Sequence, residues 1–150
     1  MAPVLRRART ADAPAIAACV DAAYRHYVAR IGRKPGPMLT DYADSIRDDQ
    51  VHVAEMDARL VGALVLAQTA EGFCLEMIAV HPGAQGTGVG RMMLEFSEAE
   101  ARRQGHRSIY LYTHEKMTEN QALYAKIGYS EYERRTEHGL ARVYMRKELT

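Results

Sequence analysis

The amino-acid sequence predicts an α/β fold in which helices cover both faces of a mixed β-sheet. Its strand-like and helix-like segments come in the order strand, helix, helix, three strands, helix, strand, helix, two strands. Residues 51–80 hold three strand-like runs separated by turns, which predicts an antiparallel meander. A helix then separates residues 73–80 from residues 107–113, which favours parallel pairing of these two strands.

The composition is typical of one ordinary globular domain over residues 1–150, with 47% apolar residues to build a core. Lys and Arg number 20 against 19 Asp and Glu, so the net charge of +1 gives no field that would attract nucleic acid or a membrane. No signal peptide or membrane-spanning run is recognisable. Cys19 and Cys74 lack metal or redox spacing, which favours buried thiols in a reducing compartment. We therefore expect a cytoplasmic protein.

The first elements are a strand, a long helix and a loop. Residues 3–9 are strand-like, and Thr10 and Asp12 offer N-cap oxygens to an alanine-rich helix that we expect to end near residue 29. Residues 31–38 hold two glycines and two prolines, so we expect neither helix nor strand there.

The next segment changes from helical to strand periodicity. Apolar residues recur at steps of three and four over residues 39–47, which predicts a second short helix. Residues 51–68 predict two strands joined by a turn near Asp57 and Ala58, and residues 73–80 predict a third.

The C-terminal part alternates between helices and strands. A helical pattern from residue 89 ends at Gly105, and residues 107–113 read as a strand. Thr118 and Gln121 stand in capping-box spacing and predict a short helix that ends before Gly128. The last two strands, residues 129–136 and 141–148, are expected to turn at His138 and Gly139.

The segment VHPGAQGTGVGRMM, residues 80–93, places three glycines in five positions between a strand and a helix. Backbone N–H groups of such a loop converge beside the positive end of the helix dipole, where a phosphate binds well. The P-loop pattern is excluded because Arg91 and Met92 replace its lysine and hydroxyl residue. The spacing of the glycines also departs from the Rossmann fingerprint. What remains is Gln85, two residues, Gly88, one residue and Gly90.

This pattern resembles the pyrophosphate loop of the GNAT superfamily of N-acetyltransferases. The order of elements, the R-x-x-x-x-D-A-x-x-I pattern from Arg7 to Ile16, the V-x-P before the loop and L-Y-x-x-x-G-Y at residues 123–129 are similar as well. The resemblance covers essentially the whole chain. It implies the GNAT fold, a mixed sheet of six to seven strands with helices on both faces and a splayed central parallel strand pair.

The resemblance implies acetyl-CoA as a co-substrate and no metal. A backbone N–H of Ile78 or Val80 is expected to stabilise the oxyanion that forms on the acetyl carbonyl. Met117 stands where many members have an asparagine, and Asn120 is the candidate replacement. The expected cofactor-binding residues are Ile78, Ala79, Val80, Gln85, Gly86, Thr87, Gly88, Val89, Gly90, Arg91 and Asn120.

Two side chains are candidates for catalysis. Tyr124 occupies the position of the tyrosine that many members use to protonate the leaving CoA sulfur, although it can equally be a packed aromatic residue. Glu76 lies on an apolar strand, where a carboxylate is costly to bury without a task. It is expected to act as the base or as a substrate contact, and a salt bridge at the rim is the alternative. His114 is assigned no role.

The resemblance therefore implies direct acetyl transfer to a primary amine of a small molecule, amino acid or peptide. The acceptor pocket is expected from residues 24–38 and the turn 137–141, whose basic residues would receive an anionic acceptor or form a solvated face: Arg25, His26, Arg30, Arg33 and Lys34. The alternatives are a non-catalytic acyl-CoA sensor or interaction domain, a nucleotide-binding α/β domain and an ordinary glycine-rich turn. A homodimer is possible.

Overall fold

Seven strands form one mixed sheet in the order β1-β2-β3-β4-β5-β7-β6 in this computed structural model, which describes residues 2–150. Only β4 and β5 pair in parallel, and the other neighbours are antiparallel. The predicted mixed sheet and its parallel pair are confirmed. The strands are β1 (Val4–Arg7), β2 (Gln50–Met56), β3 (Arg59–Thr69), β4 (Gly72–Val80), β5 (Ser108–His114), β6 (Ser130–Glu137) and β7 (Leu140–Glu148).

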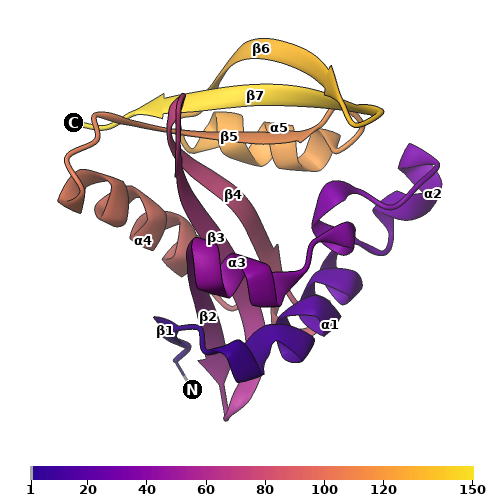
Figure 1. The fold of residues 1–150 in the computed structure, drawn as a ribbon, viewed down its shortest axis with the longest axis vertical. Coiled ribbons are helices and arrows are strands. Elements are labelled where there is room, and N and C mark those ends of the chain that lie inside the picture. Colours follow the sequence, from indigo (N-terminus) through magenta and orange to yellow (C-terminus); the bar gives the residue numbers. More distant parts are fainter. Residues whose placement is uncertain (1) are drawn as a thin grey trace.

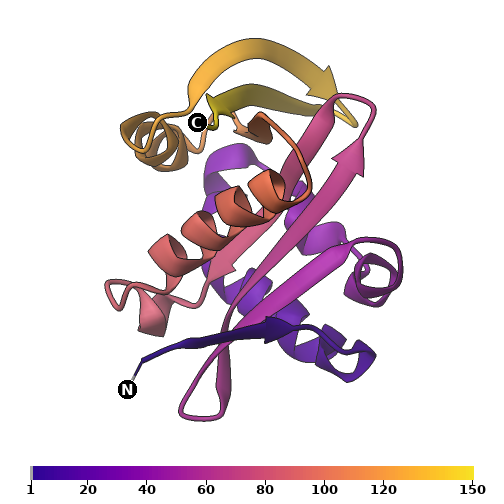
Figure 2. The same cartoon turned by 90° about the vertical axis from the view of Figure 1, so that its left-hand side faces the viewer.

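Helices cover both faces of the sheet, as predicted. In Figure 2, α4 (Val89–Arg103) lies in front of the strands, while α1 (Ala13–Tyr24) lies behind them. The helix α3 (Tyr42–Asp48) contacts α1 and β2. The short helices α2 (Tyr27–Ile31) and α5 (Thr118–Lys126) complete the set. Two apolar cores result, one between α4 and the sheet and one between α1, α3 and the opposite face of β2 to β4.

The parallel strands β4 and β5 separate soon after they meet. Their pairing is limited to Cys74 with Tyr110 and Leu75 with Leu111. The next residue, Glu76, is an extra residue in the ladder between β3 and β4, because Leu66 faces Leu75 whereas Val65 faces Met77. A bulge of this kind bends a strand and redirects a side chain. Beyond it, β4 runs away from β5, β7 and β6, as Figure 1 shows.

Two helices differ from their predicted bounds. The alanine-rich helix is interrupted after Tyr24, where the N–H of Val28 donates to the carbonyl of Arg25, only three residues back, at 3.2 Å. The chain bends there and continues as α2. The following helix begins at Tyr42, because the carboxylate of Asp41 accepts from the N–H of Ala43 at 3.0 Å and caps the helix.

The capping box predicted for α5 does not form. The Thr118 hydroxyl donates to Glu119 at 3.0 Å instead of accepting from the backbone. The Gln121 amide donates to the carbonyls of His114 and Glu115 at 3.2 and 2.9 Å. These bonds tie α5 to the end of β5, which brings Asn120 and Tyr124 to the space where β4 and β5 diverge.

No helix of residues 2–150 combines the length and the apolar character that a membrane-crossing segment needs.

Candidate active site

A cavity of about 430 Å³ lies beside the predicted glycine loop, and we call it the glycine-loop cavity. Its walls come from α1, the end of β4, the start of α4, and α5. Nine of the predicted cofactor-binding residues line it: Ile78, Ala79, Val80, Gln85, Gly86, Gly88, Gly90, Arg91 and Asn120. These nine residues therefore form one continuous surface.

The glycine loop places the start of α4 beside this cavity. Gly86 and Gly88 have φ angles of +81° and +91°, a left-handed conformation that glycine adopts without strain. Gly88 is the N-cap of α4, so the first N–H groups of a 15-residue helix are free of helical partners beside it. The Arg91 guanidinium is largely exposed and 3.7 Å from Glu95, and remains accessible at the cavity mouth. Together these groups form a site suited to an anion.

The exposed edge of β4 forms the second wall of the cavity. The N–H of His81 donates to the Val61 carbonyl of β3 at 2.8 Å. Because the backbone groups of a strand alternate between its two sides, Ile78 and Val80 direct theirs away from β3, where β5 no longer pairs. The Tyr24 hydroxyl donates to the Ile78 carbonyl at 2.8 Å. The Ile78 N–H has no strand partner, because β5 does not pair with β4 at this residue.

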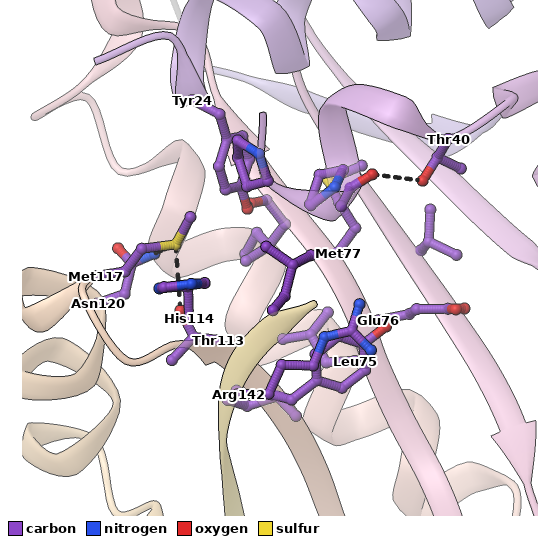
Figure 3. Close-up of a pocket in the computed structure, with 18 of the residues that line it drawn as sticks. Tyr24, Thr40, Leu75, Glu76, Met77, Thr113, His114, Met117, Asn120 and Arg142 are labelled. Carbon is purple, nitrogen blue, oxygen red and sulfur yellow. Dashed lines mark hydrogen bonds between the residues drawn. The ribbon is translucent and has the colours of Figure 1, made fainter. Parts of the chain in front are cut away.

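A second cavity, of about 190 Å³, adjoins the glycine-loop cavity at Ile78. We call it the proline-loop cavity, since Pro35, Gly36 and Pro37 form part of its wall. The Tyr42 hydroxyl donates to the Pro37 carbonyl at 2.6 Å and so fixes this loop to α3. In Figure 3, Glu76 and Arg142 lie toward one end of the cavity, and Tyr24 lies toward the other.

The two cavities meet at Tyr24, Ile78, Asn120 and Tyr124, each of which lines both of them. Tyr124 is 7% exposed, and burial raises the pKa of its phenol well above the usual value. The phenol therefore stays protonated at neutral pH and can donate a proton. Asn120 is half-buried, and its amide lies 3.7 Å from the Met117 sulfur, to which it donates.

Glu76 lines the proline-loop cavity but not the glycine-loop cavity. Desolvation raises the pKa of its carboxyl, and the charge of Asp49 raises it further, while the charge of Arg142 acts in the opposite direction. The side chain is exposed, and the bulge in β4 turns it away from the apolar core beneath α4 and onto the rim of the cavity. No salt bridge of Glu76 is found within residues 2–150.

Two predicted cofactor-binding residues do not line either cavity. The Thr87 hydroxyl donates to the Ala84 carbonyl and so shapes the loop. The Val89 side chain is buried in the core under α4. Only backbone groups of these two residues are in a position to face a ligand.

Sequence reasoning missed several residues of the site. Tyr24 begins the stretch that was expected to build the acceptor pocket but was not singled out, yet it lies where the cavities join. Arg142 directly follows the turn that was expected to build the acceptor pocket, and that proximity was the available signal. His114, to which no role was assigned, also lines the proline-loop cavity. Burial lowers the pKa of its imidazole, and its Nδ1 accepts from the Lys116 N–H at 3.1 Å.

The basic residues of the α1–α2 region do not form the acceptor wall. Arg25, His26, Arg30, Arg33 and Lys34 line neither cavity. Arg25 binds Asp21 at 2.7 Å, and Arg30 binds Glu119 at 2.5 Å. Two of the five side chains are thus paired with surface carboxylates and none of them lines a cavity, so they give no support to an anionic acceptor.

The fold and the glycine loop are those of an acetyltransferase, and the chain belongs to the GNAT acetyltransferases. The family model described as "Acetyltransferase (GNAT) domain" matches residues 47–131. This stretch includes β4, the glycine loop and Tyr124. No curated protein matches the chain.

Solved structures of similar fold cover almost the whole chain. PaiA N-acetyltransferase from Thermoplasma acidophilum, in complex with coenzyme A, is 17% identical with a TM-score of 0.81, over 99% of both chains. The ribosomal-protein-S18-alanine N-acetyltransferase from Escherichia coli is 17% identical with a TM-score of 0.78, over 99% of this chain and 94% of the other. YncA from Salmonella typhimurium, with its cofactor acetyl-CoA, is 21% identical with a TM-score of 0.69, over 100% and 95%.

Proposed function

We propose that this protein is an acetyl-CoA-dependent N-acetyltransferase that moves an acetyl group directly to a primary amine of a small molecule, amino acid or peptide. The supporting observation is that two cavities meet at Tyr24, Ile78, Asn120 and Tyr124. Direct transfer requires that donor and acceptor reach one point from separate sides. The glycine-loop cavity suits the donor, which leaves the proline-loop cavity for the amine.

The glycine-loop cavity would offer binding groups to two linked parts of coenzyme A, first its pyrophosphate and then its pantetheine arm. Backbone N–H groups from Gly86 to Gly90 would hold the pyrophosphate, with Arg91 adding charge. The free edge of β4 at Val80 would pair with pantetheine amides as an added strand does. The complexes of two similar structures with coenzyme A and acetyl-CoA support this assignment.

The residues at the junction of the cavities would carry out the chemistry. Bound acetyl-CoA would supply the acetyl group as a thioester, whose C–S bond breaks as the new C–N bond forms. The Ile78 N–H would donate to the acetyl oxygen as negative charge develops there. Tyr124 would give its proton to the departing sulfur, whose thiol has a pKa of about 8.5. Glu76, which lies away from the junction in the proline-loop cavity, would take the proton of the amine, directly or through a water.

Release of the CoA thiol from acetyl-CoA in the presence of a panel of amines tests this proposal. The native protein should release CoA only with an accepted amine, and Tyr124→Phe should lower kcat by roughly a hundredfold while acetyl-CoA binding is unchanged. Tyr129→Phe is the matched control, because Tyr129 is also buried, lies 5.7 Å from the Tyr124 ring and lines neither cavity. Acetyl-CoA binding without amine-dependent release from any panel member would favour the alternative, a sensor domain.

We also infer that residues 1–150 act as one N-acetyltransferase domain in the cytoplasm. The sheet and the apolar core beneath α4 draw on strands from the two ends of the chain, which supports a single unit. A homodimer remains a prediction, which sedimentation of the purified protein would test.

A further inference from the structure

The proline-loop cavity presents one ionic side chain of each sign. Glu76 is its only acidic side chain and Arg142 its only guanidinium among the residues that the structure describes. One further residue among Asp, Glu, His, Lys and Arg lines the cavity, and it is His114. Burial lowers the pKa of its imidazole, so the ring is neutral at pH 7. The cavity therefore offers a carboxylate and a guanidinium to whatever enters it.

Arg142 is held in place but retains unused donors. Its guanidinium stacks over the Tyr112 ring at 4.6 Å, and the side chain is 16% exposed. One nitrogen, Nη1, donates to Glu137 at the long distance of 3.4 Å. The Nε and Nη2 groups have no hydrogen-bond acceptor within residues 2–150. A fixed guanidinium with two free donors is arranged for bidentate binding of a carboxylate.

The surrounding loops limit the size of the occupant. Nη2 of Arg142 lies 3.5 Å from the position that a Cβ would take at Gly36, so the proline loop closes over the guanidinium. Farther along, Nη1 of Arg33 lies 2.6 Å from the corresponding position at Gly139, where the turn between β6 and β7 meets the chain after α2. These contacts leave a cavity of about 190 Å³. Pockets for drug-sized ligands are about 300 to 1,000 Å³, so this cavity suits a smaller molecule.

We propose that Arg142 binds a carboxylate of the acceptor and that the acceptor is a free amino acid, whose amine and carboxylate belong to one small molecule. The inference rests on the proposed function, and it names the substrate class for the same site. Arg142 fixes the carboxylate at its end of the proline-loop cavity, away from the junction with the glycine-loop cavity. The amine is then directed toward Ile78 and Tyr124, where the cavities join.

Steady-state acetylation of free amino acids and of their carboxamides tests the proposal. The native protein should have a lower KM for the accepted amino acid than for its carboxamide. Arg142→Gln should raise KM for the amino acid by roughly tenfold to a hundredfold, which is typical of losing a hydrogen bond to a charged group. It should raise KM for the carboxamide much less, because that bond involves no substrate charge. Arg142→Lys keeps the charge but not the fork, so it should restore part of the affinity.

Arg146→Gln is the matched control, because Arg146 lies on the same strand, stacks on Tyr132 at 4.1 Å and lines neither cavity. It should leave both KM values unchanged. Equal KM values for amino acids and carboxamides, or an equal effect of Arg142→Gln on both, would overturn the carboxylate site and leave the acetyltransferase standing.

If no amine is acetylated, the proposed function fails, and calorimetry still decides the carboxylate site. Amino acids titrated into the native protein with coenzyme A present should bind more tightly than their carboxamides, and Arg142→Gln should remove the difference. Absence of that difference in the native protein would overturn the proposal.

Discussion

Gly62 and Gly90 show how a single missing Cβ can serve packing in one place and a ligand in another. A Cβ at Gly62 of β3 would lie 3.0 Å from both the Met93 Cε and Val89 Cγ1 atoms of α4. A Cβ at Gly90 would lie 3.5 Å from Val80, an ordinary contact. The first glycine lets α4 approach the sheet, whereas the second lines the glycine-loop cavity.

We expect Gly62→Ala to lower the free energy of unfolding by about 1 to 3 kcal/mol, because the added methyl group overpacks the contact between α4 and β3. The Ala79 carbonyl at 3.3 Å leaves little room for adjustment on the strand side. Urea denaturation measures the change. A variant as stable as the native protein would show that α4 can shift outward freely.

Gly90→Ala should weaken acetyl-CoA binding without lowering the stability of the protein. Alanine is the better helix former, so stability should stay equal or rise by about 0.5 to 1 kcal/mol. The Cβ would occupy space that the pyrophosphate needs, so acetyl-CoA affinity should fall by about tenfold, or 1.4 kcal/mol. Calorimetric titration with acetyl-CoA measures it, and unchanged affinity would argue against binding at this loop.

The ion pair of Asp12 with Arg6 should contribute to stability in a way that depends on pH. Hydrogen bonds with Arg6, at 2.8 and 2.9 Å, hold the pKa of the Asp12 carboxyl at about 2, below the usual 3.8. Because the folded pKa is lowered, the stabilisation is complete above the unfolded value and is lost as the pH falls through about 2. Asp12→Asn should therefore lower stability by about 1 to 2 kcal/mol at pH 7.

Urea denaturation of both proteins at several pH values tests this expectation. The difference between them should shrink steadily below about pH 4. Asp44→Asn serves as the control, because the pair of Asp44 with Arg47 is more than half exposed and should contribute less than about 0.5 kcal/mol. A difference for Asp12→Asn that is constant with pH would exclude an ionic origin.

At this scale the sequence predicted backbone sites better than side-chain partners. The glycines, the strand end and Tyr124 were recognisable, since their spacing is local. The family-like pattern pointed to Arg7, whereas Arg6 is the residue that binds Asp12. The adjacent arginines face opposite sides of β1, and the side that meets Asp12 is set by the register with β2. Arg142 was missed because only tertiary contacts bring β7 beside Glu76.

At the scale of elements, β4 is shaped by its one extra residue. The apolar run FCLEMIAV predicted a strand correctly, but a continuous apolar run shows no period that would reveal a bulge. The bulge at Glu76 and the end of pairing at Leu75 occur together. The divergence of β4 from β5 was expected from the resemblance and not from the residues themselves.

The turn between β2 and β3 predicts a stabilising substitution. Asp57 and Ala58 have φ angles of 54° and 63°, which a two-residue hairpin turn of type I′ requires. A left-handed conformation costs alanine about 1 kcal/mol or more, so Ala58→Gly should stabilise the protein by about 1 kcal/mol in urea denaturation. The reciprocal change, Gly139→Ala at φ +75°, should destabilise it. A loss of stability in Ala58→Gly would contradict this account.

Across the whole molecule, two groups of strands share a core but little backbone pairing. The strands β1 to β4 meet β5, β7 and β6 only at Cys74 and Leu75, while the core under α4 continues across both groups. A ligand between β4 and β5 would therefore supply hydrogen bonds that the protein lacks on its own.

We expect coenzyme A to slow amide hydrogen exchange locally. At a concentration of about 100 times its Kd, it should stabilise the fold by about 2.7 kcal/mol. The amides of Ile78 and Val80 should change from weakly to strongly protected, whereas Ala79, which faces β3, should be protected already. Exchange measured by NMR with and without coenzyme A distinguishes these amides. Equal protection of all of them in the free protein would contradict an open edge.

The two cavities differ in how much of their walls lies within the stretch that the family model covers. The glycine loop, the open edge of β4 and Tyr124 all lie within residues 47–131, the stretch shared with the family model. The proline loop and Arg142 lie outside it. Acceptor choice can therefore evolve by exchange of two short surface segments while the transfer chemistry is inherited intact. The same modularity makes residues 32–41 and 137–142 the segments to graft when a scaffold of this kind is redirected to another amine.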